Sequence, residues 1–124
     1  MKITKSKVVP TEYEEGVVVA EYLEFLKNKG KVLVYTKTAQ ETFTKSWGVK
    51  AKNKKSGVRP GLPDYIVIFS NGQLLFIELK RRSGGVLSEY QKEWISAINE
   101  TNNKVIVARG ASEAIDYIND VLSI

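Results

Sequence analysis

The sequence contains no cysteine and no histidine, and these two absences exclude several kinds of enzyme. Without thiols the chain can form no disulfide framework, cysteine nucleophile or thiolate metal site. Without imidazole it can have no histidine general base and no histidine-ligated metal. Any catalysis must therefore use carboxylates, lysines and a hard cation that prefers oxygen ligands.

Long apolar runs are also absent. No run approaches the ~20 residues that a membrane-spanning helix needs, and the first residues lack the apolar core of a signal peptide. We therefore expect a cytoplasmic protein with no membrane partner. A length of 124 residues with 43% hydrophobic content is enough for one ordinary core, so we expect a single domain over residues 1–124.

Acidic residues are scarce in residues 31–63, which contain eight basic residues and one acid, Glu41. A run of lysines can simply keep a loop soluble. Its position beside the acidic pair described below favours a positive surface that attracts a polyanion. The residues that we predict to contact DNA are Lys50, Lys52, Lys54, Lys55, Arg59, Arg81 and Arg82.

The apolar pattern predicts an α/β chain. The expected elements are, in order, helix 11–29, strand 31–37, a two-stranded hairpin within 61–80, helix 88–99, strand 104–108 and helix 112–122. Residues 38–57 are expected to form a long DNA-facing loop with one helical turn near 41–47. We expect Trp47 in a small satellite core rather than as a stacking surface for an unpaired base, and Tyr90 on the inner face of its helix.

The hairpin is the most informative stretch, because charged groups lie where its core strands end. A two-residue turn would place Asp64 and Glu78 on opposite faces. A three-residue loop, Ser70 to Gly72, instead places Asp64 directly opposite Glu78. Lys80 shares the face of Glu78 because side chains alternate along a strand. Two carboxylates and one ammonium group then converge.

Such a group suits metal-assisted phosphodiester hydrolysis. Mg²⁺ or Mn²⁺ could be held by Asp64, Glu78 and the backbone carbonyl of Leu79, together with a phosphate oxygen. The metal would activate water and neutralise charge, while Lys80 would position the attacking water or stabilise the transition state. The plainer alternatives are that Asp64 ends a turn and that Glu78 and Lys80 form an exposed pair. Apolar residues on both faces of the second strand argue against exposure.

Two motifs resemble a known family. Pro63-Asp64, an apolar hairpin and then Glu-Leu-Lys at 78–80 resemble the PD-(D/E)xK nuclease superfamily. The longer pattern, G-x-R-P-G-x-P-D-Y at 57–65 with L-S-x-x-Q-x-x-W at 87–94, resembles its VRR-NUC branch. This resemblance implies a restriction-endonuclease-like αβββαβα core, in which a four-stranded mixed sheet is flanked by helices.

The resemblance also implies a function. The branch includes stand-alone phage and bacterial proteins of similar size and is associated with nicking or resolving branched DNA. We therefore expect a Mg²⁺- or Mn²⁺-dependent DNA endonuclease for branched DNA such as Holliday junctions, in a bacterium or a phage-infected host cell. Symmetric cutting of a junction requires two sites, so a homodimer is expected. The alternative is a non-catalytic nucleic-acid-binding module on the same fold.

Further site residues follow from the resemblance. It places Gln91 at the active site, although Gln91 would also complete a capping box with Ser88, and both roles stay open. It places an acid of the first helix near the metal, Glu14 or else Glu15, although both acids would also stabilise the helix dipole. Gly16 departs from the branch, in which glutamine is common at this position.

Overall fold

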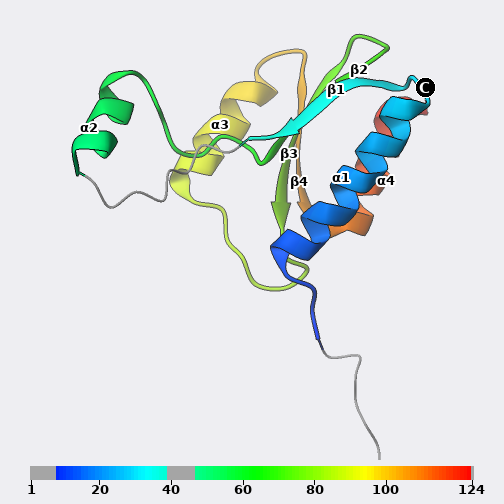
Figure 1. The fold of residues 1–124 in the computed structure, drawn as a ribbon, viewed down its shortest axis with the longest axis horizontal. Coiled ribbons are helices and arrows are strands. Elements are labelled where there is room, and N and C mark those ends of the chain that lie inside the picture. The colour runs from blue at the N-terminus through cyan, green and yellow to red at the C-terminus, as the bar shows by residue number, and fades with distance from the viewer. Residues whose placement is uncertain (1–7, 39–46, 124) are drawn as a thin grey trace, which may run out of the picture.

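The computed structural model describes residues 8–38 and 47–123, in which helices and strands alternate (Figure 1). Along the chain the elements are α1 (Glu12–Asn28), β1 (Val32–Lys37), α2 (Trp47–Lys55), β2 (Tyr65–Phe69), β3 (Leu74–Lys80), α3 (Glu89–Asn99), β4 (Lys104–Arg109) and α4 (Ala111–Leu122). None of these helices is long and apolar enough to cross a membrane.

The predicted αβββαβα core is confirmed, but an additional helix, α2, lies where a loop was expected. None of the nine residues of α2 is buried. Apolar periodicity detects helices through the face that they bury, so a helix that buries nothing leaves no such pattern. The helical turn expected near 41–47 lies almost wholly outside the described residues.

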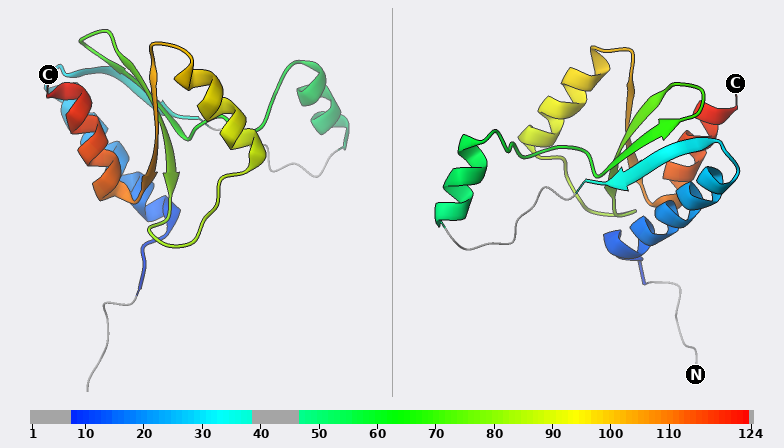
Figure 2. Two further views of the ribbon diagram at one scale, coloured as in Figure 1. Left: turned by 180° about the vertical axis from the view of Figure 1, so that it is seen from behind. Right: turned by 45° about the horizontal axis from the view of Figure 1, so that its top comes forward.

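The four strands form one mixed sheet in the order β1-β2-β3-β4. The pairs β1–β2 and β2–β3 are antiparallel, whereas β3 and β4 are parallel. Helix α3 lies in the crossover between β3 and β4 and packs against β4, as a parallel connection requires. Helices α1 and α4 pack against each other on the opposite face of the sheet (Figures 1 and 2).

The main core lies between the sheet and the α1–α4 layer. Alternate residues of β2 and β3 enter it because strand side chains alternate between the two faces. Its fully buried members include Val19, Leu23, Val67, Phe69, Leu75, Ile77, Ala114 and Ile118. The remaining positions of β3, among them Glu78 and Lys80, face the side of the sheet that α3 covers.

The hairpin between β2 and β3 closes through the expected three-residue loop. The Phe69 N–H donates to the Gln73 carbonyl at 2.9 Å, and Gly72 has a φ of 93°, which glycine adopts without strain. Val67 pairs with Leu75, and the same register extends to place Asp64 opposite Glu78. The predicted register is therefore confirmed.

Candidate active site

Glu78 is a buried acid near the end of β3, with only 2% of its surface exposed. Its Oε2 accepts a hydrogen bond from Gln91 Nε2 at 2.8 Å and lies 3.4 Å from Lys80 Nζ. Its Oε1 is buried and has no hydrogen-bond partner within the described residues. The exposed ion pair considered above for Glu78 and Lys80 is therefore wrong, since only 12% of the Lys80 side chain is exposed as well.

Asp64 is held just before β2 by contacts on both sides. Its Oδ2 accepts the Leu79 N–H at 2.8 Å, which joins Asp64 to the residue between Glu78 and Lys80. Its backbone carbonyl accepts the Thr38 N–H at 2.7 Å, and the Thr38 hydroxyl donates to the Pro63 carbonyl at 2.5 Å. Sequence reasoning missed Thr38, because nothing local marks a threonine at a strand end as a support for this turn.

Gln91 makes the contacts of the capping box and also contacts Glu78 and Lys80, while its role in catalysis stays a prediction. Its side-chain oxygen accepts the Ser88 N–H at 2.9 Å, and its backbone N–H donates to Ser88 Oγ at 3.1 Å, which completes the capping box. The same oxygen accepts from Lys80 Nζ at 3.2 Å. Two donors thus fix the amide orientation, so Nε2 must face Glu78.

The electrostatics of the site disfavour two negative charges side by side. Burial raises the pKa of Glu78, and the neighbouring Asp64 carboxylate raises it further, to about 7, despite the Lys80 ammonium group. Burial likewise raises the pKa of Asp64, although the Leu79 N–H and Lys80 act against this shift. At low pH the pair is stabilised by a proton, and a bound cation would stabilise it when both groups are ionised.

The two acids of α1 have other partners. Glu14 is exposed and accepts the Thr11 N–H at 2.8 Å in the capping box of α1, and these contacts with Thr11 lower its pKa. Glu15 is buried and accepts from Arg82 Nε at 2.9 Å and from the Ala111 N–H at 3.1 Å. Neither acid contacts Asp64, Glu78 or Lys80 within the described chain. A metal-binding role for either acid stays a prediction, as does that of the Leu79 carbonyl.

The departure at Gly16 has a steric reason. A Cβ atom added there would lie 2.6 Å from the Tyr65 hydroxyl oxygen. That hydroxyl donates to the Gly16 carbonyl at 3.3 Å. Glutamine or any other larger residue at this position would require the Tyr65 side chain to move.

The basic residues fall into two groups. Three arginines have protein partners, since Arg59 donates to the Lys54 and Val58 carbonyls, Arg81 donates to the Val9 carbonyl and Arg82 pairs with Glu15. The four lysines of α2 form no ion pair within the described ranges. They are Lys50, Lys52, Lys54 and Lys55.

The predicted burial of Trp47 is wrong. Its surface is 83% exposed, and Lys50 Nζ lies 5.4 Å from the centre of its ring. Trp47 therefore belongs to the outer surface of α2 and not to a satellite core.

The fold and the site together define the class of the protein. A four-stranded mixed sheet flanked by helices presents two facing acids and a lysine at the end of its central strands. This is the arrangement of a nuclease-type domain with a restriction-endonuclease-like fold. Comparisons with known proteins then identify the family.

The family model for the VRR-NUC domain matches residues 13–112, and the chain belongs to this family. A solved VRR_NUC domain protein is 26% identical and has a TM-score of 0.72, over 90% of this chain and 88% of that chain. Another solved VRR_NUC domain is 20% identical and shares the fold, with a TM-score of 0.62 over 89% of this chain and 97% of that chain. Among curated proteins, none matches the chain.

Proposed function

We propose that this protein is a metal-dependent, structure-specific DNA endonuclease that hydrolyses phosphodiester bonds in branched DNA. The observation that carries the proposal is the pairing of the half-buried Asp64 with the buried Glu78, which face each other beside Lys80. Burial raises the pKa of both acids, and the Asp64 carboxylate raises that of Glu78 further, so this arrangement is costly for stability alone. Membership of the VRR-NUC family, a nuclease-type domain, supports the same conclusion.

The residues present fit a hard divalent cation. The unpartnered Oε1 of Glu78 is available as a ligand, and Asp64 can supply a second carboxylate oxygen. No group of three or more acidic, histidine or cysteine side chains gathers in the parts of the chain that the structure describes. Mg²⁺ or Mn²⁺ would therefore be held by these two carboxylates, with the Leu79 carbonyl and water or phosphate oxygens completing the set.

The mechanism assigns a role to each side chain. A bound cation supplies Lewis acidity and charge neutralisation at the scissile phosphate. Lys80, held by Glu78 and Gln91, presents its ammonium group to the attacking water or to the charge that develops on the phosphate. Gln91 orients both Glu78 and Lys80, so it positions the two charged groups relative to each other.

The proposed substrate follows from charge and from the family. The lysines of α2 form no ion pair with a described residue and can neutralise phosphates on one flank of the site. Arg59, Arg81 and Arg82 are the other proposed DNA contacts, although Arg82 already pairs with Glu15. Branched DNA and a homodimer follow by analogy with the VRR-NUC branch, because cutting a junction symmetrically requires two sites. Light scattering at several protein concentrations tests the dimer.

The experiment that tests the activity compares wild type with Lys80→Ala. Labelled four-way junction, flap, duplex and single-stranded DNA are incubated with Mg²⁺, Mn²⁺ or EDTA. We expect cleavage of branched substrates by wild type with either metal, and a loss of about 100-fold or more for Lys80→Ala, because a preorganised charge at the transition state is worth this much. Lys92→Ala is the matched control, since Lys92 is an exposed lysine of α3.

One outcome would contradict the proposal. If wild type binds these DNAs but forms no metal-dependent product beyond that of Lys80→Ala, the protein is a non-catalytic nucleic-acid-binding module. The intact set of two acids and a lysine favours the enzyme over this alternative.

A further inference from the structure

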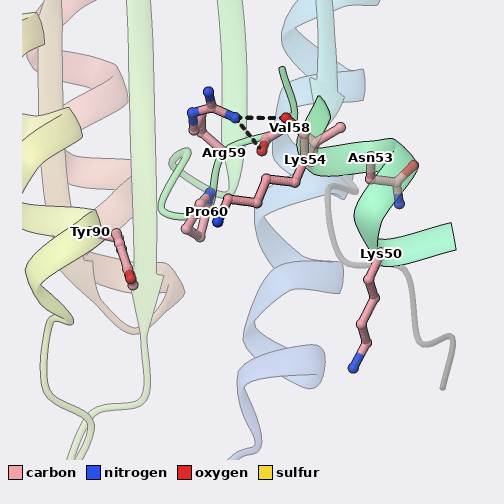
Figure 3. Close-up of a pocket in the computed structure, with 7 residues that line it drawn as sticks. All are labelled: Lys50, Asn53, Lys54, Val58, Arg59, Pro60 and Tyr90. Carbon is pink, nitrogen blue, oxygen red and sulfur yellow. Dashed lines mark hydrogen bonds between the residues drawn. The ribbon is translucent and has the colours of Figure 1, made fainter. Parts of the chain in front are cut away.

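A pocket of about 330 Å³ lies between α2 and the first turn of α3 (Figure 3). Its size is at the lower end of the range of about 300–1,000 Å³ for pockets that bind small ligands. In Figure 3 Tyr90 lies across the pocket from the residues of α2. The lining residues are Lys50, Asn53, Lys54, Val58, Arg59, Pro60 and Tyr90.

The charge of this pocket suits an anion. Three of its seven lining side chains are cationic and none is acidic. One nitrogen of Arg59 donates to the carbonyls of Lys54 and Val58, which fixes the guanidinium group in place and leaves its other N–H groups to donate elsewhere. Lys50 and Lys54 make no ion pair with any described residue. Arginine and lysine side chains in this arrangement are suited to bind a phosphate group.

The side of the pocket opposite α2 carries an aromatic ring, that of Tyr90 (Figure 3). Tyr90 is 58% exposed, so the prediction that it faces inward is wrong. Val58 and Pro60 also line the pocket and add apolar surface to it. A flat, accessible ring beside cationic side chains is the combination that binds single-stranded nucleic acids, in which bases stack on aromatic rings while phosphates meet positive charge.

The Tyr90 side of the pocket is joined to the acidic site. Trp94 Nε1 donates to the Pro60 carbonyl at 2.9 Å. Gly61 has a φ of 98° and lies so close to α3 that a Cβ atom there would be 2.5 Å from the Tyr90 backbone. Tyr90 also directly precedes Gln91, which binds Glu78. A ligand in the pocket therefore lies beside the proposed cleavage site and not on a distant surface.

We propose that this pocket is a subsite for an unpaired nucleotide of the DNA substrate. Its phosphate binds Lys50 and Lys54, and its base stacks on Tyr90. A base in the interior of a duplex has both faces covered by its neighbours, whereas an unpaired nucleotide can present a face to the ring. The inference deepens the proposed function, on which it rests, and implies that the preferred substrates carry a single-stranded segment beside the cut bond.

Binding experiments in EDTA test this subsite without cleavage. Fluorescence anisotropy compares a blunt duplex with the same duplex carrying a short single-stranded extension. We expect wild type to bind the extended DNA more tightly. Tyr90→Leu should lose about tenfold in affinity for the extended DNA, the size of one stacking contact, with little change for the blunt duplex. Tyr90→Phe should retain the preference.

A matched pair of double variants separates the pocket from general charge. Lys50→Ser with Lys54→Ser and Lys52→Ser with Lys55→Ser remove the same charge from the same helix, but only the first pair lines the pocket. Both should weaken binding to the blunt duplex to a similar extent. Only the first should abolish the preference for the extended DNA. Circular dichroism checks that each variant is folded.

The results distinguish this inference from the proposed function. If wild type shows no preference, or if Tyr90→Leu weakens binding to both DNAs equally, the subsite does not exist, whether or not the protein cleaves DNA. If the preference depends on Tyr90 but no metal-dependent cleavage occurs, the subsite stands and the endonuclease proposal fails.

Discussion

At the scale of single residues, Glu78 is almost completely buried and another acid faces it. Gln91 and Lys80 satisfy one of its oxygens, while the other has no partner among the described residues. Burial and the Asp64 charge raise the pKa of Glu78 from 4.5 to about 7. The residue thus favours its protonated form until a cation or a higher pH changes the balance.

This shift predicts how stability depends on pH. A carboxyl group whose pKa is raised on folding contributes stability that is complete below about pH 4.5 and is lost as pH rises through about 7. The raised pKa of Asp64 acts in the same direction. Between pH 4.5 and pH 8, wild type should lose on the order of 3 kcal/mol of unfolding free energy through this titration. Glu78→Gln should lose little, because its side chain cannot ionise.

Urea unfolding at a series of pH values measures the effect, with Glu89→Gln as the control because Glu89 is exposed on α3. At pH 8, Mg²⁺ or Mn²⁺ should raise the melting temperature of wild type but not of Glu78→Gln, since the metal binds the ionised carboxylates. If the unfolding free energies of wild type and Glu78→Gln change with pH in the same way, the predicted rise in the pKa of Glu78 is wrong.

At the scale of elements, α2 differs from the other helices. Helices α1, α3 and α4 each bury at least one residue, whereas α2 buries none. A helix of nine residues is shorter than the ~12–15 that an isolated helix needs to persist in water. Arg59 and the backbone N–H groups of Gly57 and Val58 donate to carbonyls of its last turn, and none of its residues joins the core.

We therefore predict that α2 opens independently of the sheet. Its backbone amides should exchange with solvent at least 100-fold faster than those of β3, as measured by native-state hydrogen exchange. DNA with a single-stranded extension should slow the exchange of α2, because its lysines then have phosphate partners. Equal protection of α2 and β3 in the free protein would contradict this prediction. Trp47→Ser serves as a control, because Trp47 is exposed and its replacement should lower the unfolding free energy by less than about 0.5 kcal/mol.

At the scale of the whole molecule, one buried acid connects distant segments. Glu15 of α1 binds Arg82, which follows β3, and the Ala111 N–H at the start of α4. The adjacent Gly110 N–H donates to the Lys80 carbonyl at 2.9 Å. The end of β3, which presents the acidic site, is thus held in place by both helices of the α1–α4 layer.

Removing Arg82 from its contact with Glu15 should lower the unfolding free energy more than neutralising Glu15. Arg82→Ala leaves a buried carboxylate without its partner, and we expect a loss of about 3 kcal/mol. Glu15→Gln leaves an arginine that is already 56% exposed, so the loss should be about 1 kcal/mol. Urea unfolding of both variants and of the double variant tests the coupling. Additive losses would mean that the two side chains act independently.

Local sequence accounts for much of the site. The three-residue loop and the alternation of strand side chains correctly predict that Asp64 faces Glu78 and that Lys80 shares this face. The capping box at Ser88 is predicted from four consecutive residues. These features depend on backbone geometry within one hairpin or one helical turn, so they can be predicted without knowing how distant segments pack.

Only the tertiary structure determined the rest, because it depends on which distant segments pack together. Glu15 meets the amide of a residue 96 positions away, and Thr38 supports a turn 25 positions away. Tyr90 is exposed because Pro60 and Gly61 pack against the α3 backbone and Trp94. Helix α2 buries no residue, so no apolar pattern in the sequence predicts it. The sequence alone determined how the two acids and the lysine are placed in the hairpin, because that placement follows from local backbone geometry. The pocket beside them was decided only by the packing of distant segments.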